Sequence, residues 1–162
     1  MLTQLRCPIR LSFSSTDELI VSDIETVGTL YQKDRDRYHL VLTEPLVTEW
    51  NLLFQTYDIL TSATIPTPRL LWFEFSPYRV AMTMQGNGQF SYRHLFEPGV
   101  FGTTRYWLQE SNSLSEQISL RNFTRNLHVK GNPLPCYVLL EYELWAQQLK
   151  LGAYTLSFEI QH

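Results

Sequence analysis

The chain has 162 residues, of which 44% are hydrophobic and 18% are charged, and its formal net charge is −3. These values exclude a disordered chain and predict a single globular domain over residues 1–162. The acidic balance argues against a general nucleic-acid binder, because neutralising phosphates requires a basic surface. The segment 121–130 interleaves basic and aromatic residues as a single-strand binding platform would, but the overall charge opposes that function.

The two cysteines, Cys7 and Cys136, are far apart in the sequence. Their number and spacing match neither a zinc site nor a disulfide framework, so we expect no metal and no cofactor. The sequence does not reveal whether the two thiols are near each other. The first residues lack the regions of a signal peptide, and no apolar run approaches the ~20 residues that span a bilayer. We therefore expect a soluble, cytoplasmic protein without a membrane span.

The first third of the chain reads as strands. Residues 3–13 predict a strand that Pro8 interrupts, because proline cannot donate to a sheet ladder. Residues 18–29 carry aliphatic side chains without a clean period and predict one or two short strands. Residues 28–42 predict a hairpin whose tip is the charged segment 32–37.

Residues 45–60 predict the strongest helix of the chain. Pro45 suits the first helical position, and apolar side chains follow at helical spacing. They form a single stripe, which is typical of a helix packed on a sheet. The stripe consists of Leu46, Trp50, Leu53, Phe54 and Tyr57.

Residues 69–108 predict antiparallel strands joined by short turns. The segments 78–84 and 89–96 alternate between two sets of side chains, as strands do. Gly86-Asn-Gly88 between them favours a tight hairpin turn, because glycine and asparagine adopt positive φ at little cost. The segments 69–75 and 101–108 predict further strands on either side.

Residues 112–121 predict a second, short helix, with a long loop as the alternative, because Ser113 and Glu116 match a capping box. Residues 122–130 then resume a strand, and residues 131–135 have the glycine and prolines of a turn.

The clearest pattern lies in residues 136–160, which predict a long antiparallel hairpin. From Tyr154 onward, apolar and polar side chains alternate, so one face of the strand is dry. An alternative interpretation makes 141–151 a short helix that Gly152 ends, because its residues favour helices. The apolar run before this segment and the alternation after Gly152 favour the hairpin.

These elements predict an α+β fold with a mainly antiparallel β-sheet, in a sandwich-like or barrel-like form. The fold includes one amphipathic helix at about 45–60 and a second short helix near 112–121. The apolar stripe of the first helix favours α+β over an all-β sandwich or barrel with a helical insertion. We expect the hairpin at 136–160 to close the sheet.

No catalytic motif is evident. The chain lacks a nucleophile elbow, a dinucleotide-binding loop and a P-loop, and no histidine pair has helical metal-ligand spacing. One segment combines Arg93, His94 and Glu97, with Arg79 on a neighbouring predicted strand. Such a group can bind an anion or transfer a proton, with His94 as the shuttle. The alternative is a set of ordinary surface residues on a half-exposed sheet.

Three functional hypotheses follow, and whether the protein is an enzyme stays open. The first is a non-enzymatic accessory, scaffold or assembly protein that contacts a protein partner or a second copy, because aromatic and arginine side chains dominate binding surfaces. The second is a β-barrel that binds a small hydrophobic ligand. The third is a hydrolase or lyase that uses His94, Glu97 and Arg93.

The candidate binding residues for these hypotheses are Tyr78, Arg79, Tyr92, Arg93, His94, Phe101, Arg105, Tyr106 and Trp107. The residues expected to line a ligand-binding barrel are Trp72, Phe73, Phe75, Met82, Met84 and Phe90.

Overall fold

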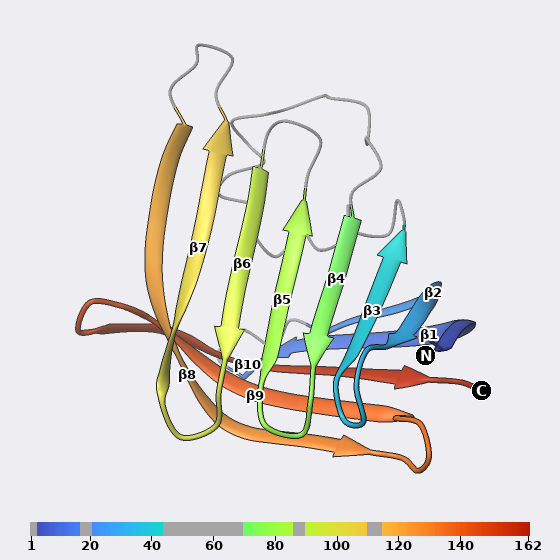
Figure 1. Ribbon diagram of the computed structural model, residues 1–162. Helices are drawn as coiled ribbons and strands as arrows, with labels where there is room; N and C mark the ends of the chain where they lie inside the picture. The colour runs from blue at the N-terminus through green and yellow to red at the C-terminus, as the bar shows by residue number, and fades with distance from the viewer. Residues whose placement is uncertain (1–2, 17–20, 44–69, 86–89, 110–114) are drawn as a thin grey trace.

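The computed structural model describes residues 3–16, 21–43, 70–85, 90–109 and 115–162. In these residues the chain is all β, without a helix. Ten antiparallel strands form a closed barrel in which consecutive strands pair and β1 pairs with β10 (Figure 1). The strands are β1 (Thr3–Ser15), β2 (Val21–Gln32), β3 (Tyr38–Thr43), β4 (Leu70–Phe75), β5 (Val80–Gln85), β6 (Phe90–Phe96), β7 (Phe101–Gln109), β8 (Ser115–Lys130), β9 (Tyr137–Ala146) and β10 (Leu149–Ile160).

Two layers of strands cross each other in this barrel. Figure 1 shows β3 to β7 side by side in one layer, with β1, β9 and β10 running across it. Strand β8 takes part in both layers, because its first part pairs with β7 and its last part pairs with β9. The register with β9 shifts between Thr124 and Asn126. A bulge of this kind bends a strand and increases its twist, so β8 turns the corner between the layers.

The predicted C-terminal hairpin is confirmed. Strands β9 and β10 pair antiparallel from Leu149 opposite Ala146 to Glu159 opposite Tyr137, so the alternative helix over 141–151 is wrong. The dry face predicted for its second strand is buried at Leu156, Phe158 and Ile160. The hairpin closes the barrel, because β9 pairs with β8 while β10 pairs with β1. The predicted hairpin over 28–42 is also present, as β2 and β3.

The predicted α+β class is wrong. The helix expected near 112–121 is replaced by the start of β8, whose residues from Ser115 pair with β7. Ile118 and Leu120 pack against the core while Gln117 and Ser119 are exposed, which is a period of two rather than a helical period. Pairing with β7 therefore outweighs the local capping pattern. The helix expected at 45–60 and the turn at 86–88 lie outside the described residues, although β5 and β6 pair as expected.

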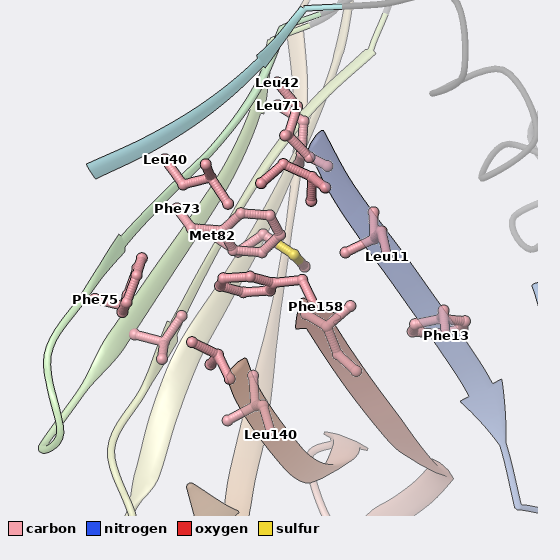
Figure 2. Packing of buried hydrophobic residues seen from close by; sticks show 14 of the residues in the cluster. Leu11, Phe13, Leu40, Leu42, Leu71, Phe73, Phe75, Met82, Leu140 and Phe158 are labelled. Atoms are coloured by element: carbon pink, nitrogen blue, oxygen red, sulfur yellow. The ribbon is translucent and has the colours of Figure 1, made fainter. Parts of the chain in front are cut away.

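One part of the interior is a filled hydrophobic core. Figure 2 shows side chains of β1, β3, β4, β5, β9 and β10 converging around Phe158. The exposed fraction is 0% for Phe73 and 1% for Met82 and Phe158. The ring centroids of Phe73 and Phe158 are 4.8 Å apart, which is contact distance for a tilted aromatic pair. Each such buried side chain contributes roughly 1.5–3 kcal/mol, so this part holds the two layers together.

Candidate functional site

A second part of the interior is lined by β6 to β9 and differs in chemistry from the core around Phe158. The strand alternation that buries Leu and Phe elsewhere here buries tyrosines, a histidine and small polar side chains. We call this the tyrosine-lined part. It consists of Tyr92, His94, Thr104, Tyr106, Asn122, Thr124 and Tyr142.

Three of these residues share a hydrogen-bond network. Asn122 Nδ2 donates to Thr104 Oγ1 at 2.8 Å, and Thr104 Oγ1 lies 2.9 Å from His94 Nδ1. Both contacts are satisfied when the Thr104 hydroxyl donates to Nδ1, which places the His94 proton on Nε2. Thr104 and Asn122 are 0% exposed and His94 is 1% exposed, so water does not compete for these bonds.

The network is uncharged. Burial lowers the pKa of His94 to about 3, so its ring is neutral at physiological pH. Burial, followed by the neighbouring Tyr106, Tyr92 and Tyr154, raises the pKa of Tyr142 well above its ordinary value, which keeps that phenol protonated. The tyrosine-lined part therefore offers hydrogen bonds and ring faces but no formal charge.

Two buried acceptors in this part have no hydrogen-bond partner among the described residues. They are Asn122 Oδ1 and Thr124 Oγ1, and both residues are 0% exposed. Leaving such an atom unpaired costs about 1–3 kcal/mol, and buried polar atoms in proteins are nearly always paired. Each of these two atoms therefore calls for a hydrogen-bond donor that the described residues do not supply.

Aromatic rings surround the network at contact distance. The His94 ring stacks on Phe96 with centroids 5.3 Å apart and an interplanar angle of 8°. It meets Tyr92 and Tyr106 edge-on at 5.1 Å and 5.7 Å. Edge-to-face contacts of this kind are favourable because the positive ring edge meets a negative ring face. The rings hold His94 in one orientation.

The side of the tyrosine-lined part that β7, β8 and β10 form is less completely buried. Ile118 lies opposite Tyr106 and Leu120 lies opposite Thr104, and both pack against the core yet are only half-buried. Tyr154, which contacts Tyr142 with centroids 5.5 Å apart, is half-buried as well. Solvent therefore reaches core-facing side chains on this side, next to the network.

The proposed acid–base group is not assembled. His94 points into the barrel, whereas Arg93 lies on the outer face and donates to Thr83 Oγ1 at 3.2 Å. Glu97 is exposed in the turn after β6. A catalytic group needs its side chains within hydrogen-bond reach in one cleft. The structure thus gives no support to an enzyme that uses His94, Glu97 and Arg93 together.

The candidate binding residues are divided between three places. Tyr92, His94 and Tyr106 meet inside the barrel, and Arg93 lies directly opposite Arg105 on the outside. Phe101 and Trp107 also belong to the outer side of β7, by alternation with buried Thr104 and Tyr106. Tyr78 and Arg79 line a groove of about 760 Å³ at one end of the barrel, where the turns at 33–37 and 76–79 meet.

That groove has a lining of mixed charge. Its charged lining residues include three cations and three carboxylates, and His39 Nε2 lies 3.6 Å from Glu74 Oε1. These residues are Lys33, Arg37, Arg79, Asp36, Glu74 and Glu97. A crevice of about 550 Å³ on the N- and C-terminal side is lined by both Cys7 and Cys136, which are free thiols. Burial raises the pKa of Cys7, so its thiol is not activated as a nucleophile.

The expected lining of a ligand-binding barrel is correct only in part. Phe73, Phe75, Met82 and Met84 point inward, but they are buried in the filled core. Trp72 alternates with Leu71 and Phe73 and lies on the outer side, and the side chain of Phe90 lies outside the described set. Within the described ranges, no cluster of three His, Cys, Asp or Glu residues could hold a metal ion.

Sequence reasoning missed four residues of the tyrosine-lined part. They are Thr104, Asn122, Thr124 and Tyr142. The available signal was the alternation that puts Thr104 with Tyr106, and Asn122 with Thr124, on one strand face. Threonine and asparagine on a face shared with aromatic residues indicate a buried polar cluster only when neighbouring strands supply partners.

No protein-family model matches the chain, and no curated protein matches it. The structure is similar to the crystal structure of the ywiB protein from Bacillus subtilis, with a TM-score of 0.62 and 13% sequence identity over 99% of this chain and 94% of that chain. Ail, the attachment invasion locus protein of Yersinia pestis, gives a TM-score of 0.23 at 10% identity over 98% of this chain and 96% of that chain, which is too low to support an argument. The first match supports the barrel fold alone. In the described part of the chain, no helix is long and apolar enough to cross a membrane.

Proposed function

We propose that the protein binds a small, uncharged molecule in the tyrosine-lined part of its barrel. The observation that carries this proposal is the pair of buried acceptors, Asn122 Oδ1 and Thr124 Oγ1, which have no partner among the described residues. A ligand with an N–H or O–H group would supply the missing donor. Barrels with more strands than the smallest closed types enclose ligand sites, and this barrel has ten strands.

The chemistry of the lining defines the ligand class. The side chains of Tyr92, Tyr106 and Tyr142 present ring faces and edges, which favours a planar aromatic molecule. A carboxylate or an ammonium group would be desolvated without a counter-charge, because His94 is neutral there. The ligand is therefore an uncharged aromatic molecule with one hydrogen-bond donor.

Binding can be tested with a matched set of probes on the full chain. Indole has a ring and a donor, 1-methylindole lacks the donor, and indole-2-carboxylate adds a charge. Isothermal titration should rank indole first. We expect 1-methylindole to bind about fivefold or more weakly, because one hydrogen bond worth about 1 kcal/mol is not made, and indole-2-carboxylate to bind more weakly than indole because its charge is desolvated. Native mass spectrometry of the purified protein would also detect a molecule that copurifies.

Two interior variants and one outer-face control assign the binding to the interior. Thr124→Val removes one acceptor and should weaken indole binding, whereas Thr103→Val on the outer face of β7 should not. Leu120→Trp places a larger side chain beside Thr104 and should compete with the probe. Failure of all three probes to bind would contradict the proposal. Equal binding of indole and 1-methylindole would contradict the role of the donor.

A further inference from the structure

The outer faces of β6, β7 and the first part of β8 form a surface that carries several arginine side chains. Alternation leaves one set of side chains outward, and Arg93 lies directly opposite Arg105 across β6 and β7. Like charges directly opposite each other destabilise a sheet. We call this surface the arginine face. It consists of Arg93, Arg105, Arg121 and Arg125, together with Leu95, Val100 and Phe101.

Positive charge on this face is not balanced within it. The described side chains of 91–96, 101–107 and 117–125 include four arginines and no carboxylate, although the whole chain has a net charge of −3. Arg93 has a partial partner in Glu74, at 3.8 Å on β4, which lies two strands away beyond β5. Arg105 is exposed, and the described residues place no carboxylate at ion-pair distance from it.

An exposed apolar cluster adjoins these arginines. Phe101 is 50% exposed, Val100 is 45% exposed and Leu95 is 44% exposed. The Phe101 ring is held by Phe123, with centroids 5.1 Å apart, and the Arg121 guanidinium lies 4.7 Å from its centroid. A cation above a ring face is an attractive contact, so both side chains are held ready for a partner.

The neighbouring acid, Glu143 on β9, does not neutralise the face. Its carboxylate lies 2.9 Å from Arg125 and 3.4 Å from Lys150, and it accepts a hydrogen bond from Trp145 Nε1 at 3.1 Å. Burial opposes its ionisation, but the bonds from Trp145 and Lys150 and the charges of Lys150 and Arg125 outweigh burial and lower its pKa. One carboxylate with two cations leaves the group positive.

We propose that the arginine face binds an acidic polypeptide segment of another protein, with an apolar side chain placed beside its carboxylates. Arg105 and Phe101 are four residues apart on β7, which is about 13 Å in a strand. An extended segment that presents a carboxylate to Arg93 and Arg105 would therefore contact Phe101 with a side chain about four residues away. Arginine and aromatic side chains that meet at one surface are typical of interface hot spots.

Two other occupants fit less well. A symmetric contact between two copies would set arginine against arginine, because the same surface meets itself. Single-stranded nucleic acid would match the arginines and Phe101, but it would leave the exposed aliphatic Leu95 and Val100 without apolar contacts, and the net charge of the chain repels it. This proposal is independent of ligand binding inside the barrel.

Fluorescence anisotropy with labelled probes tests the proposal on the full chain. The probe is a 12-residue peptide of two Asp-Glu-Ser-Ser-Leu-Ser repeats, which places each leucine four residues after an aspartate. Its controls are two Asp-Glu-Ser-Ser-Ser-Ser repeats, two Lys-Lys-Ser-Ser-Leu-Ser repeats and a 12-nucleotide oligo-dT. We expect the first peptide to bind most tightly, to weaken about tenfold in Arg105→Glu and to weaken as salt is raised. Phe101→Ser should reduce the advantage of the leucine peptide over its serine control.

Arg6→Glu, on the outer face of β1 opposite Thr29, is the matched control and should leave binding unchanged. Arg105 has no ion-pair partner in the described structure, so its reversal should not unfold the barrel, and circular dichroism would verify this. The proposal is overturned if the acidic leucine peptide does not bind, if Arg105→Glu leaves its affinity unchanged, or if oligo-dT binds more tightly.

Discussion

The barrel interior has two parts, one around Phe158 and one around His94. The same strand alternation creates both, but they differ in how they are stabilised. Around Phe158, aliphatic and aromatic side chains fill the space between the layers, and none of them needs a hydrogen bond (Figure 2). Around His94, three tyrosines enclose a polar network, and Asn122 and the nearby Thr124 keep acceptors that are unpaired among the described residues. The first part gains stability from burial, whereas the second loses some of it by burying polar atoms.

The difference indicates that the core around Phe158 stabilises the fold, whereas the tyrosine-lined part is available for binding. An apolar core of this size tolerates a second region that is not optimised for stability, because proteins need only a few kcal/mol in total. Sites that bind ligands commonly keep polar groups that the protein alone does not satisfy. We therefore expect side-chain truncations in the two parts to lower the free energy of unfolding by different amounts.

The largest effect is expected for Phe158→Ala in the apolar part. Its ring contacts both Phe73 and Phe75, so truncation leaves a cavity that the surrounding strands cannot close. We expect a loss of about 3–5 kcal/mol in the free energy of unfolding, measured by urea denaturation. Phe101→Ala, at a ring 50% exposed outside the barrel, is the control and should cost about 1 kcal/mol or less. Equal losses would refute the assignment of the core.

Thr104→Val should have the next largest effect, in the polar network. Thr104 Oγ1 contacts both His94 Nδ1 and Asn122 Nδ2, so valine leaves two buried polar atoms without a partner. We expect a loss of about 2–3 kcal/mol in the same denaturation experiment. The exposed Thr103→Val beside it is the control, with an expected change within about 0.5 kcal/mol. A change as small at Thr104 would mean that the network is not formed.

Local patterns in the sequence predict the strands and hairpins well, because alternation and turn residues act over a few positions. The hairpin over 136–160 is an example, since its dry face and its antiparallel pairing both follow from residues within it. The start of β8 shows where local patterns fail. Ser113 and Glu116 suggest a helix start, yet Ile118 and Leu120 belong to a strand that pairs with β7, and the local pattern does not indicate this pairing.

The closure of the barrel and the polar network depend on residues far apart in the chain. Pairing of β1 with β10 joins Ile9 to Ile160, and no local pattern reports a contact of that separation. Thr104 and Asn122 become a pair only because β7 and β8 lie side by side. The sequence identifies His94 as a candidate but groups it with Arg93 and Glu97, because one strand alone does not show which of its faces is enclosed.

The third prediction concerns pH and His94. Its folded pKa of about 3 lies below the ordinary value of 6.5, so between these values the unfolded chain binds a proton that the folded chain does not. Stability contributed by neutral His94 is therefore present at pH 8 and falls as the pH is lowered. We expect a loss of about 2 kcal/mol at pH 5 relative to pH 8. In His94→Gln, which cannot titrate, the difference between pH 8 and pH 5 should shrink by that amount, and an unchanged difference would show that His94 is not buried.

The smallest effect on stability is expected for Thr124→Val, and it separates the two explanations of the unpaired acceptors. Thr124 is as buried as Thr104, at 0% exposure, but its hydroxyl oxygen has no partner among the described residues. Valine has nearly the same shape and removes a polar atom that gains nothing from burial, so the free energy of unfolding should change by about 0.5 kcal/mol or less, or should rise. If Thr124 serves a ligand, indole affinity should fall in the same variant while stability does not. A loss of stability as large as that of Thr104→Val would instead mean that the Thr124 hydroxyl stabilises the barrel. The two parts of the interior would then differ in composition, but both would serve to stabilise the fold.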